Sequence, residues 1–215
     1  TSTGLRWNGR RGRSSLMVQS YYNHYKDTYD QYKRTGGIKK LSIWDEYYNK
    51  EWVLHNYESP QPVEEKAPAE EYLPGTRENL DVNICPYIEQ NPDTKFVVFF
   101  PPYSILFWND VVVGNHLEAT LAQYRYLAER LNAYDNVEVY FFPDREDIIL
   151  DLNNYADYSH YHPRYNRFMA ECFADGSTGL VAKEGSKKGK TIDEYLSHMK
   201  TIVQNYDFEE LLSGE

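Results

Sequence analysis

The 215-residue sequence has little cysteine, no long apolar run and a deficit of positive charge. Its best uninterrupted apolar stretches, residues 96–100 and 105–108, are far shorter than the roughly 20 residues that a membrane-spanning helix requires. We therefore expect no membrane span in this chain. The formal net charge of -10 argues against a nucleic acid partner, because neutralising phosphates requires a basic face. Two short basic clusters, residues 6–13 and 183–190, are typical of solvated loops.

The sequence also lacks the spacing of a metal or phosphate site. The two cysteines, Cys85 and Cys172, lie far apart, so a single disulfide and two buried thiols both remain open. No second histidine or cysteine lies three or four residues from the scattered histidines, and no phosphate-binding glycine motif is complete. We expect neither a metal nor another cofactor. The scattered histidines are His24, His55, His116 and His198.

What the sequence has in excess is tyrosine, with 21 residues. Four of them recur at steps of three and four residues along a helix predicted for residues 16–33: Tyr21, Tyr25, Tyr29 and Tyr32. Such a stripe is typical of half-buried packing. The amphipathic ring also suits contact with a sugar, which would require the stripe to be exposed.

Composition and periodicity divide the chain into two regions. Residues 1–75 form an amino-terminal arm and a Tyr-rich helical region, with a helical pattern at residues 43–57 and four prolines in an extended segment from residue 59. Residues 76–215 form the α/β region. There we predict helices over residues 76–90, 114–134, 163–173 and 191–206, and buried strands over residues 96–100 and 137–142. The strand–helix–strand order has the size of a right-handed parallel crossover.

Ligands in open α/β sheets gather beyond the carboxyl ends of the strands, which directs attention to the loops at residues 101–108 and 144–160. The second loop places Asp157 three residues before His160. The carboxylate can hold one ring nitrogen while the other faces a nucleophile. On spacing alone, however, a turn or a helix cap is the more common explanation of such a pair.

Residues 96–108 (FVVFFPPYSILFW) and 151–166 (DLNNYADYSHYHPRYN) together resemble the later part of an SGNH-hydrolase-like domain. The resemblance covers about residues 76–173. Within that superfamily, the chain is similar to extracytoplasmic proteins of teichoic acid D-alanylation and polysaccharide O-acylation. It implies a three-layer parallel sheet with flanking helices, incomplete at the amino end. It also implies that Asp157 orients His160, the general base toward a serine. Tyr103 and Trp108 would line the substrate cleft.

The nucleophile of that family is not evident. Its G-D-S or G-S-S block, which follows a first buried strand, has no counterpart here, and the glycine and Gly-x-Asn-Asp blocks of the oxyanion site are missing. Ser2 is the early serine with the most suggestive neighbours, but no strand precedes it. We interpret Asn109-Asp110 as a loop turn. Either the chain is the carboxyl-terminal part of a longer protein with its nucleophile upstream, or it has lost catalysis; the missing first strand favours the former.

Two functions follow as hypotheses. The first is acyl transfer or ester hydrolysis on a bacterial cell-envelope polymer. Its partners would be a polysaccharide or acyl carrier, its location extracytoplasmic or cell-surface, and any membrane anchor would lie outside this chain. The second is a non-catalytic scaffold module that binds a glycan or a protein through aromatic faces. The sequence does not indicate an oligomeric state.

Overall fold

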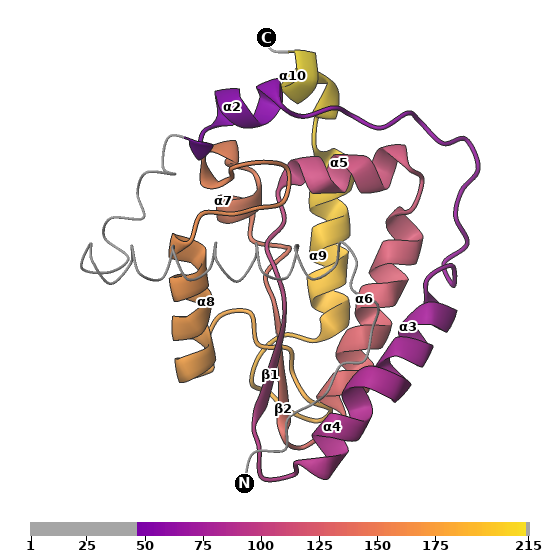
Figure 1. Ribbon diagram of the computed structural model, residues 1–215, viewed down its shortest axis with the longest axis vertical. Coiled ribbons are helices and arrows are strands. Elements are labelled where there is room, and N and C mark those ends of the chain that lie inside the picture. The colour runs from indigo at the N-terminus through magenta and orange to yellow at the C-terminus, as the bar shows by residue number, and fades with distance from the viewer. Residues whose placement is uncertain (1–46, 214–215) are drawn as a thin grey trace, which may run out of the picture. The chain divides into compact units, whose positions relative to one another are not determined.

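The structure is a computed structural model that describes residues 47–213 (Figure 1). The chain divides into two units, Thr1–Glu46 and Tyr47–Glu215, and the fold below is that of the second. Ser2, the basic arm and the predicted tyrosine helix lie outside the described residues.

Residues 47–75 belong to the second unit. Helix α2 (Lys50–His55) begins where the side chain of Asn49 accepts a hydrogen bond from the backbone N–H of Trp52. Its first N–H, from Lys50, donates to Asn153 Oδ1 at 3.1 Å. The proline-rich segment that follows is extended, and its backbone also bonds to the body of this unit, for example from Val63 N to Val113 O at 2.9 Å.

The helix predicted for residues 76–90 is three consecutive segments: α3 (Leu73–Asn79), the π-helix η2 (Leu80–Ile84) and α4 (Cys85–Gln90). It starts earlier than predicted because Pro74 occupies the first turn, where a missing N–H costs nothing. Thr76 is therefore inside the helix rather than its cap. The π turn precedes Pro86, which has no N–H for the α-helical bond to Val82, and Cys85 N instead bonds to Leu80 O.

The predicted strand–helix–strand unit is confirmed. Strand β1 (Phe96–Phe100) leads through α5 (Ile105–Val113) and α6 (Leu117–Asn132) to strand β2 (Val137–Phe141). The strands are parallel, with Phe96 opposite Val137. The described part of the chain is thus mixed α/β with a two-stranded parallel sheet. Asn109 and Asp110 lie inside α5, so their prediction as a loop turn is wrong.

The two outer edges of this sheet differ. The outer edge of β2 is covered, because Phe141 N donates to Gly179 O at 2.7 Å and Val181 N donates to Val139 O at 2.8 Å. In β1 the even-numbered residues bond to β2, as Phe96 N does to Asn136 O. Backbone groups alternate along a strand, so the N–H and C=O groups of residues 97 and 99 point away from β2. Among residues 47–213, β1 pairs with β2 alone.

The remaining elements are α7 (Glu146–Ile149), the 3-10 helix η3 (Leu152–Asn154), α8 (Arg164–Asp175), α9 (Ile192–Asn205) and α10 (Phe208–Ser213). Figure 1 shows α8 on one side of the strands and α6 and α9 on the other. Accordingly, Val139 and Phe141 belong to the larger core with α6 and α9, whereas Tyr140 packs with Met169 and Cys172 of α8. Alternate residues of β2 therefore serve two apolar layers.

Both cysteines are buried free thiols, which settles the alternative between a disulfide and thiols for Cys85 and Cys172. Within residues 47–213, no helix has the length and apolar character to cross a membrane.

Candidate functional site

The loop at residues 155–162 lies beside the carboxyl end of β1. It leaves η3 and folds back on itself, with Tyr155 and Tyr161 forming an isolated antiparallel bridge and Ala156 N donating to His160 O at 2.9 Å. The hydroxyl of Tyr155 donates to Pro102 O at 2.6 Å, which attaches the loop to the turn after β1. The chain thus places the D-x-x-H motif where the fold predicts a ligand site.

Asp157 binds its neighbours through both carboxylate oxygens. Oδ1 accepts backbone hydrogen bonds from Ser159 N at 2.8 Å and His160 N at 2.7 Å, which closes the turn. Oδ2 lies 2.6 Å from Nδ1 of the His160 ring. The two explanations offered by the sequence, a turn and a carboxylate–imidazole pair, therefore describe the same residue.

The electrostatics of the turn keep Asp157 ionised. Burial acts to raise the pKa of its carboxyl group, but the backbone N–H groups of Ser159 and His160 and the His160 ring outweigh burial and hold that pKa below its usual range. An ionised carboxylate only accepts hydrogen bonds, so Nδ1 of His160 must carry the proton. In the neutral ring the lone pair then lies on Nε2.

The imidazole of His160 borders a pocket of about 480 Å3. Its side chain is 78% exposed, and within residues 47–213 no group hydrogen-bonds to Nε2. Three of the lining side chains are aromatic, one of them Tyr103, which we predicted as a substrate contact. The described lining residues are Phe99, Pro101, Tyr103, Ser159, His160, Tyr161 and Asn166.

Trp108 does not line this pocket, contrary to expectation. The loop after β1 ends at Ser104, because α5 begins at Ile105 and turns Trp108 into the core. The indole is fully buried against Phe107 and Tyr124, with ring centroids 5.5 and 6.1 Å away. The apolar pattern of residues 101–108 identified an aromatic segment, but it did not show which of the aromatic rings faces solvent.

The described serine at a strand–turn–helix position is Ser104, which the sequence analysis missed. It is fully buried, follows β1 by four residues and caps α5, accepting from Leu106 N at 3.2 Å. Its hydroxyl donates to Tyr158 O at 2.5 Å. With both hydrogen-bonding directions used and no exposure, Ser104 is a structural link rather than a nucleophile. The signal that could have found it is the strand-ending sequence FFPPYS.

A second histidine also contacts carboxylates, but both of its nitrogens are occupied. His198 Nδ1 lies 3.0 Å from Asp144 Oδ2, and His198 Nε2 lies 3.0 Å from Glu146 Oε1. Asp144 is buried just after β2, and that burial raises its pKa. This cluster ties α9 to the start of α7 and leaves no ring nitrogen for a substrate.

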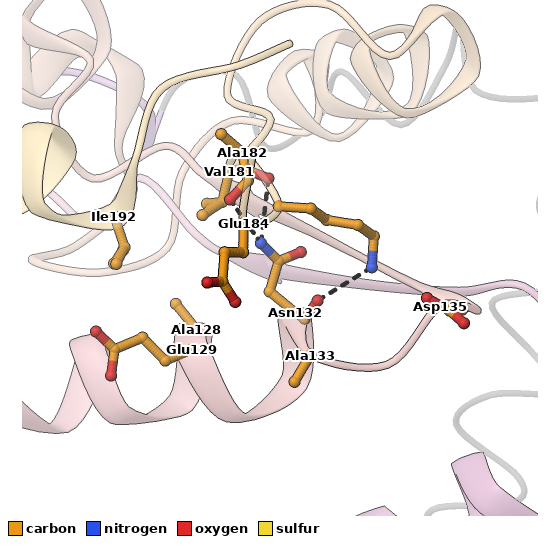
Figure 2. Close-up of a pocket in the computed structure, with 10 residues that line it drawn as sticks. Ala128, Glu129, Asn132, Ala133, Asp135, Val181, Ala182, Glu184 and Ile192 are labelled. Carbon is orange, nitrogen blue, oxygen red and sulfur yellow. Dashed lines mark hydrogen bonds between the residues drawn. The ribbon is translucent and has the colours of Figure 1, made fainter. Parts of the chain in front are cut away.

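A larger hollow, of about 560 Å3, lies at the amino end of β2 (Figure 2). Its polar groups mostly serve the fold: Asn132 Nδ2 donates to Ala182 O at 2.9 Å, and Lys183 Nζ donates to Asn132 O and Tyr134 O at the end of α6. The described lining contains no histidine or serine; it consists of Ala128, Glu129, Asn132, Ala133, Asp135, Val181, Ala182, Lys183, Glu184 and Ile192. The smaller pocket beside His160 is therefore the better candidate for chemistry.

No group of three or more metal-ligating side chains that could hold an ion occurs in the described residues. The chain matches no known family model, no curated protein and no solved structure.

Proposed function

We propose that Asp157 is the orienting carboxylate and His160 the general base of an SGNH-like site that transfers or hydrolyses an acyl ester, with a serine nucleophile from outside residues 47–213. The observation that carries this proposal is the 2.6 Å contact between Asp157 Oδ2 and His160 Nδ1, with the ring at the border of a pocket. The location of that pocket, beyond the carboxyl end of β1, gives further support.

In the proposed reaction the serine hydroxyl passes its proton to His160 Nε2 as its oxygen bonds to the acyl carbon. The imidazolium, stabilised by Asp157, then donates this proton to the departing oxygen as the original ester bond breaks. A water molecule or a polymer hydroxyl attacks the acyl-serine by the same two proton transfers and releases the serine. Ser2, the early serine that the sequence singled out, lies outside the described residues and stays an untested prediction.

The family resemblance extends the proposal to the acceptor, a bacterial cell-envelope polymer, and to an extracytoplasmic or cell-surface location with an acyl carrier as donor. It also includes the three-layer sheet of that family. Strand β1 supports this part of the proposal, because FVVFF is apolar on both faces, as is typical of an inner strand of a parallel sheet. Its side chains Val97 and Phe99 are 38% and 41% exposed. A further strand beside β1 would pair with the backbone groups of residues 97 and 99 and pack its own side chains beside these two.

A second candidate function is a non-catalytic module that binds a glycan or a protein. The aromatic side chains of Phe99, Tyr103 and Tyr161 around the pocket favour it, since flat rings, two of them with a polar hydroxyl, suit such ligands. In this case the Asp157–His160 turn would be structural. The two functions differ in whether an activated serine reacts.

The test measures labelling by a fluorophosphonate and hydrolysis of p-nitrophenyl acetate, on the 215-residue chain and on the polypeptide encoded by the complete reading frame. His160→Ala should lower the rate by several orders of magnitude, about 10⁴- to 10⁶-fold. His55→Ala, which removes an exposed ring at the end of α2, is the control and should leave the rate unchanged. An unchanged rate in His160→Ala would contradict the catalytic proposal. A failure of both proteins to react would favour the binding module.

A further inference from the structure

We propose that Ser104 is a positioning residue for His160, because its buried hydroxyl fixes the loop that presents the imidazole to the pocket. This inference rests on the proposed function and adds a residue that the D-x-x-H motif does not contain. Ser104 would act through the loop backbone and would not itself contact the acyl group.

Ser104 lies between helix α5 and the loop that carries His160. On one side its Oγ accepts from Leu106 N at 3.2 Å and so belongs to the first turn of α5. On the other side the same hydroxyl donates to Tyr158 O at 2.5 Å, two residues before His160. The side chain is completely buried, so water does not compete for either bond.

A second bond from the same turn reaches the other end of the loop. Tyr155 is fully buried, and its hydroxyl donates to Pro102 O at 2.6 Å. Pro102 and Ser104 both lie in the four residues between β1 and α5. The start and the middle of the loop are thus attached to one short turn at the carboxyl end of β1.

These attachments matter because the bonds nearest the ring, from Ala156 N to His160 O and to the Asp157 carboxylate, join the loop to itself and not to the turn after β1. The His160 side chain is mostly exposed, so its direction depends on the backbone from Asp157 to His160. A displacement of about 1 Å in a catalytic group can lower a rate about 100-fold. Losing the Ser104 hydroxyl should therefore reduce the population in which Nδ1 faces Asp157.

The experiment reads the tautomer of His160 directly, by ¹⁵N NMR of the imidazole at about pH 8.5, well above the ordinary histidine pKa of about 6.5. An unrestrained neutral histidine favours the proton on Nε2, whereas the bond to Asp157 requires it on Nδ1. The chain is compared with Ser104→Ala, Ser104→Thr and Tyr155→Phe. Urea midpoints and backbone amide spectra confirm that each variant is folded.

Thr191→Ala is the matched control. Thr191 caps α9 as Ser104 caps α5, with Oγ1 accepting from Glu194 N at 3.2 Å, but it makes no bond to the loop. It should lower the urea midpoint through the lost cap, though less than Ser104→Ala does because Thr191 is exposed, while leaving the His160 tautomer unchanged. This control separates the loss of a helix cap from the loss of the loop attachment.

We expect wild type and Ser104→Thr to carry the proton on Nδ1, and Ser104→Ala and Tyr155→Phe to shift toward the Nε2 form. Turnover of p-nitrophenyl acetate should fall about 10- to 100-fold in Ser104→Ala and recover in Ser104→Thr. If Ser104→Ala keeps the wild-type tautomer, the positioning role is wrong while the proposed function stands. If wild type itself carries the proton on Nε2, there is no oriented base, and both proposals fail.

Discussion

Asp157 holds His160 at two places, with one carboxylate oxygen 2.7 Å from its backbone nitrogen and the other 2.6 Å from ring nitrogen Nδ1. The backbone bond sets where the loop turns, and the ring bond sets which nitrogen carries the proton. A single side chain therefore fixes both the position and the protonation pattern of the imidazole.

The first prediction concerns Asp157→Asn, which keeps an oxygen for the turn but removes the charge. The pKa of Asp157 is lowered in the folded protein, so its carboxylate contributes stability above the unfolded pKa of about 4, and this is lost as pH falls through the folded value. Because the side chain is 45% exposed, the contribution at pH 7 should be only about 1 kcal/mol. Urea unfolding of both proteins at neutral and strongly acidic pH measures it. If the free energies of unfolding of wild type and Asp157→Asn differ as much in acid as at pH 7, this account is wrong.

The second prediction compares two tryptophans. Trp108 is fully buried on α5, whereas Trp52 on α2 is 40% exposed. Trp108→Ala should cost about 3–5 kcal/mol of unfolding free energy, because it removes buried apolar area and leaves a cavity. Trp52→Ala should cost less than about 1.5 kcal/mol. Urea titration followed by circular dichroism measures both. If the two variants lose the same free energy of unfolding, Trp108 is not buried as described.

The third prediction concerns His198→Ala, which leaves the buried carboxyl of Asp144 without its ring partner. The loss should be about 1–3 kcal/mol at pH 7. Burial raises the pKa of Asp144 in the folded protein, so keeping this carboxylate charged lowers the free energy of unfolding. That cost is complete above the folded pKa and absent below the unfolded pKa of about 4, where the group is protonated in both states. The destabilisation should therefore shrink in acid.

His55→Ala serves as the control for that measurement, since it removes an exposed imidazole elsewhere. If the destabilisation of both variants depends on pH in the same way, it arises from the loss of any histidine and not from the contact with Asp144.

The parts of the fold that the sequence predicted are those set by strong local patterns. The apolar run of β1 predicted a strand, although Val97 and Phe99 on one of its faces are exposed, and Thr191 with Glu194 forms the capping box that begins α9. Boundaries were less accurate where a proline changed the helix: Pro74 moved the start of α3, and Pro86 introduced a π turn.

The candidate site was predictable only in part. The spacing of Asp157 and His160 identified a pair that does make contact. Ser104 was missed because, although the sequence FFPPYS marks a serine after a strand, its bond to Tyr158, 54 residues away, is not visible in any local pattern. Trp108 was placed in the cleft because hydropathy does not distinguish a ring in a loop from one on the inner face of a helix.

The π turn at Leu80–Ile84 changes the rotational phase of the helix around it. Leu80 and Cys85 are five residues apart, which an ideal α-helix would place on different sides, yet both are buried. The π turn takes up one extra residue, so that Ile88 lies on the same buried side of the helix as Leu80 and Cys85. A homologous chain without proline at position 86 could therefore be one residue shorter here and still present the same apolar surface, so a single-residue gap at this point would leave the helix packing intact.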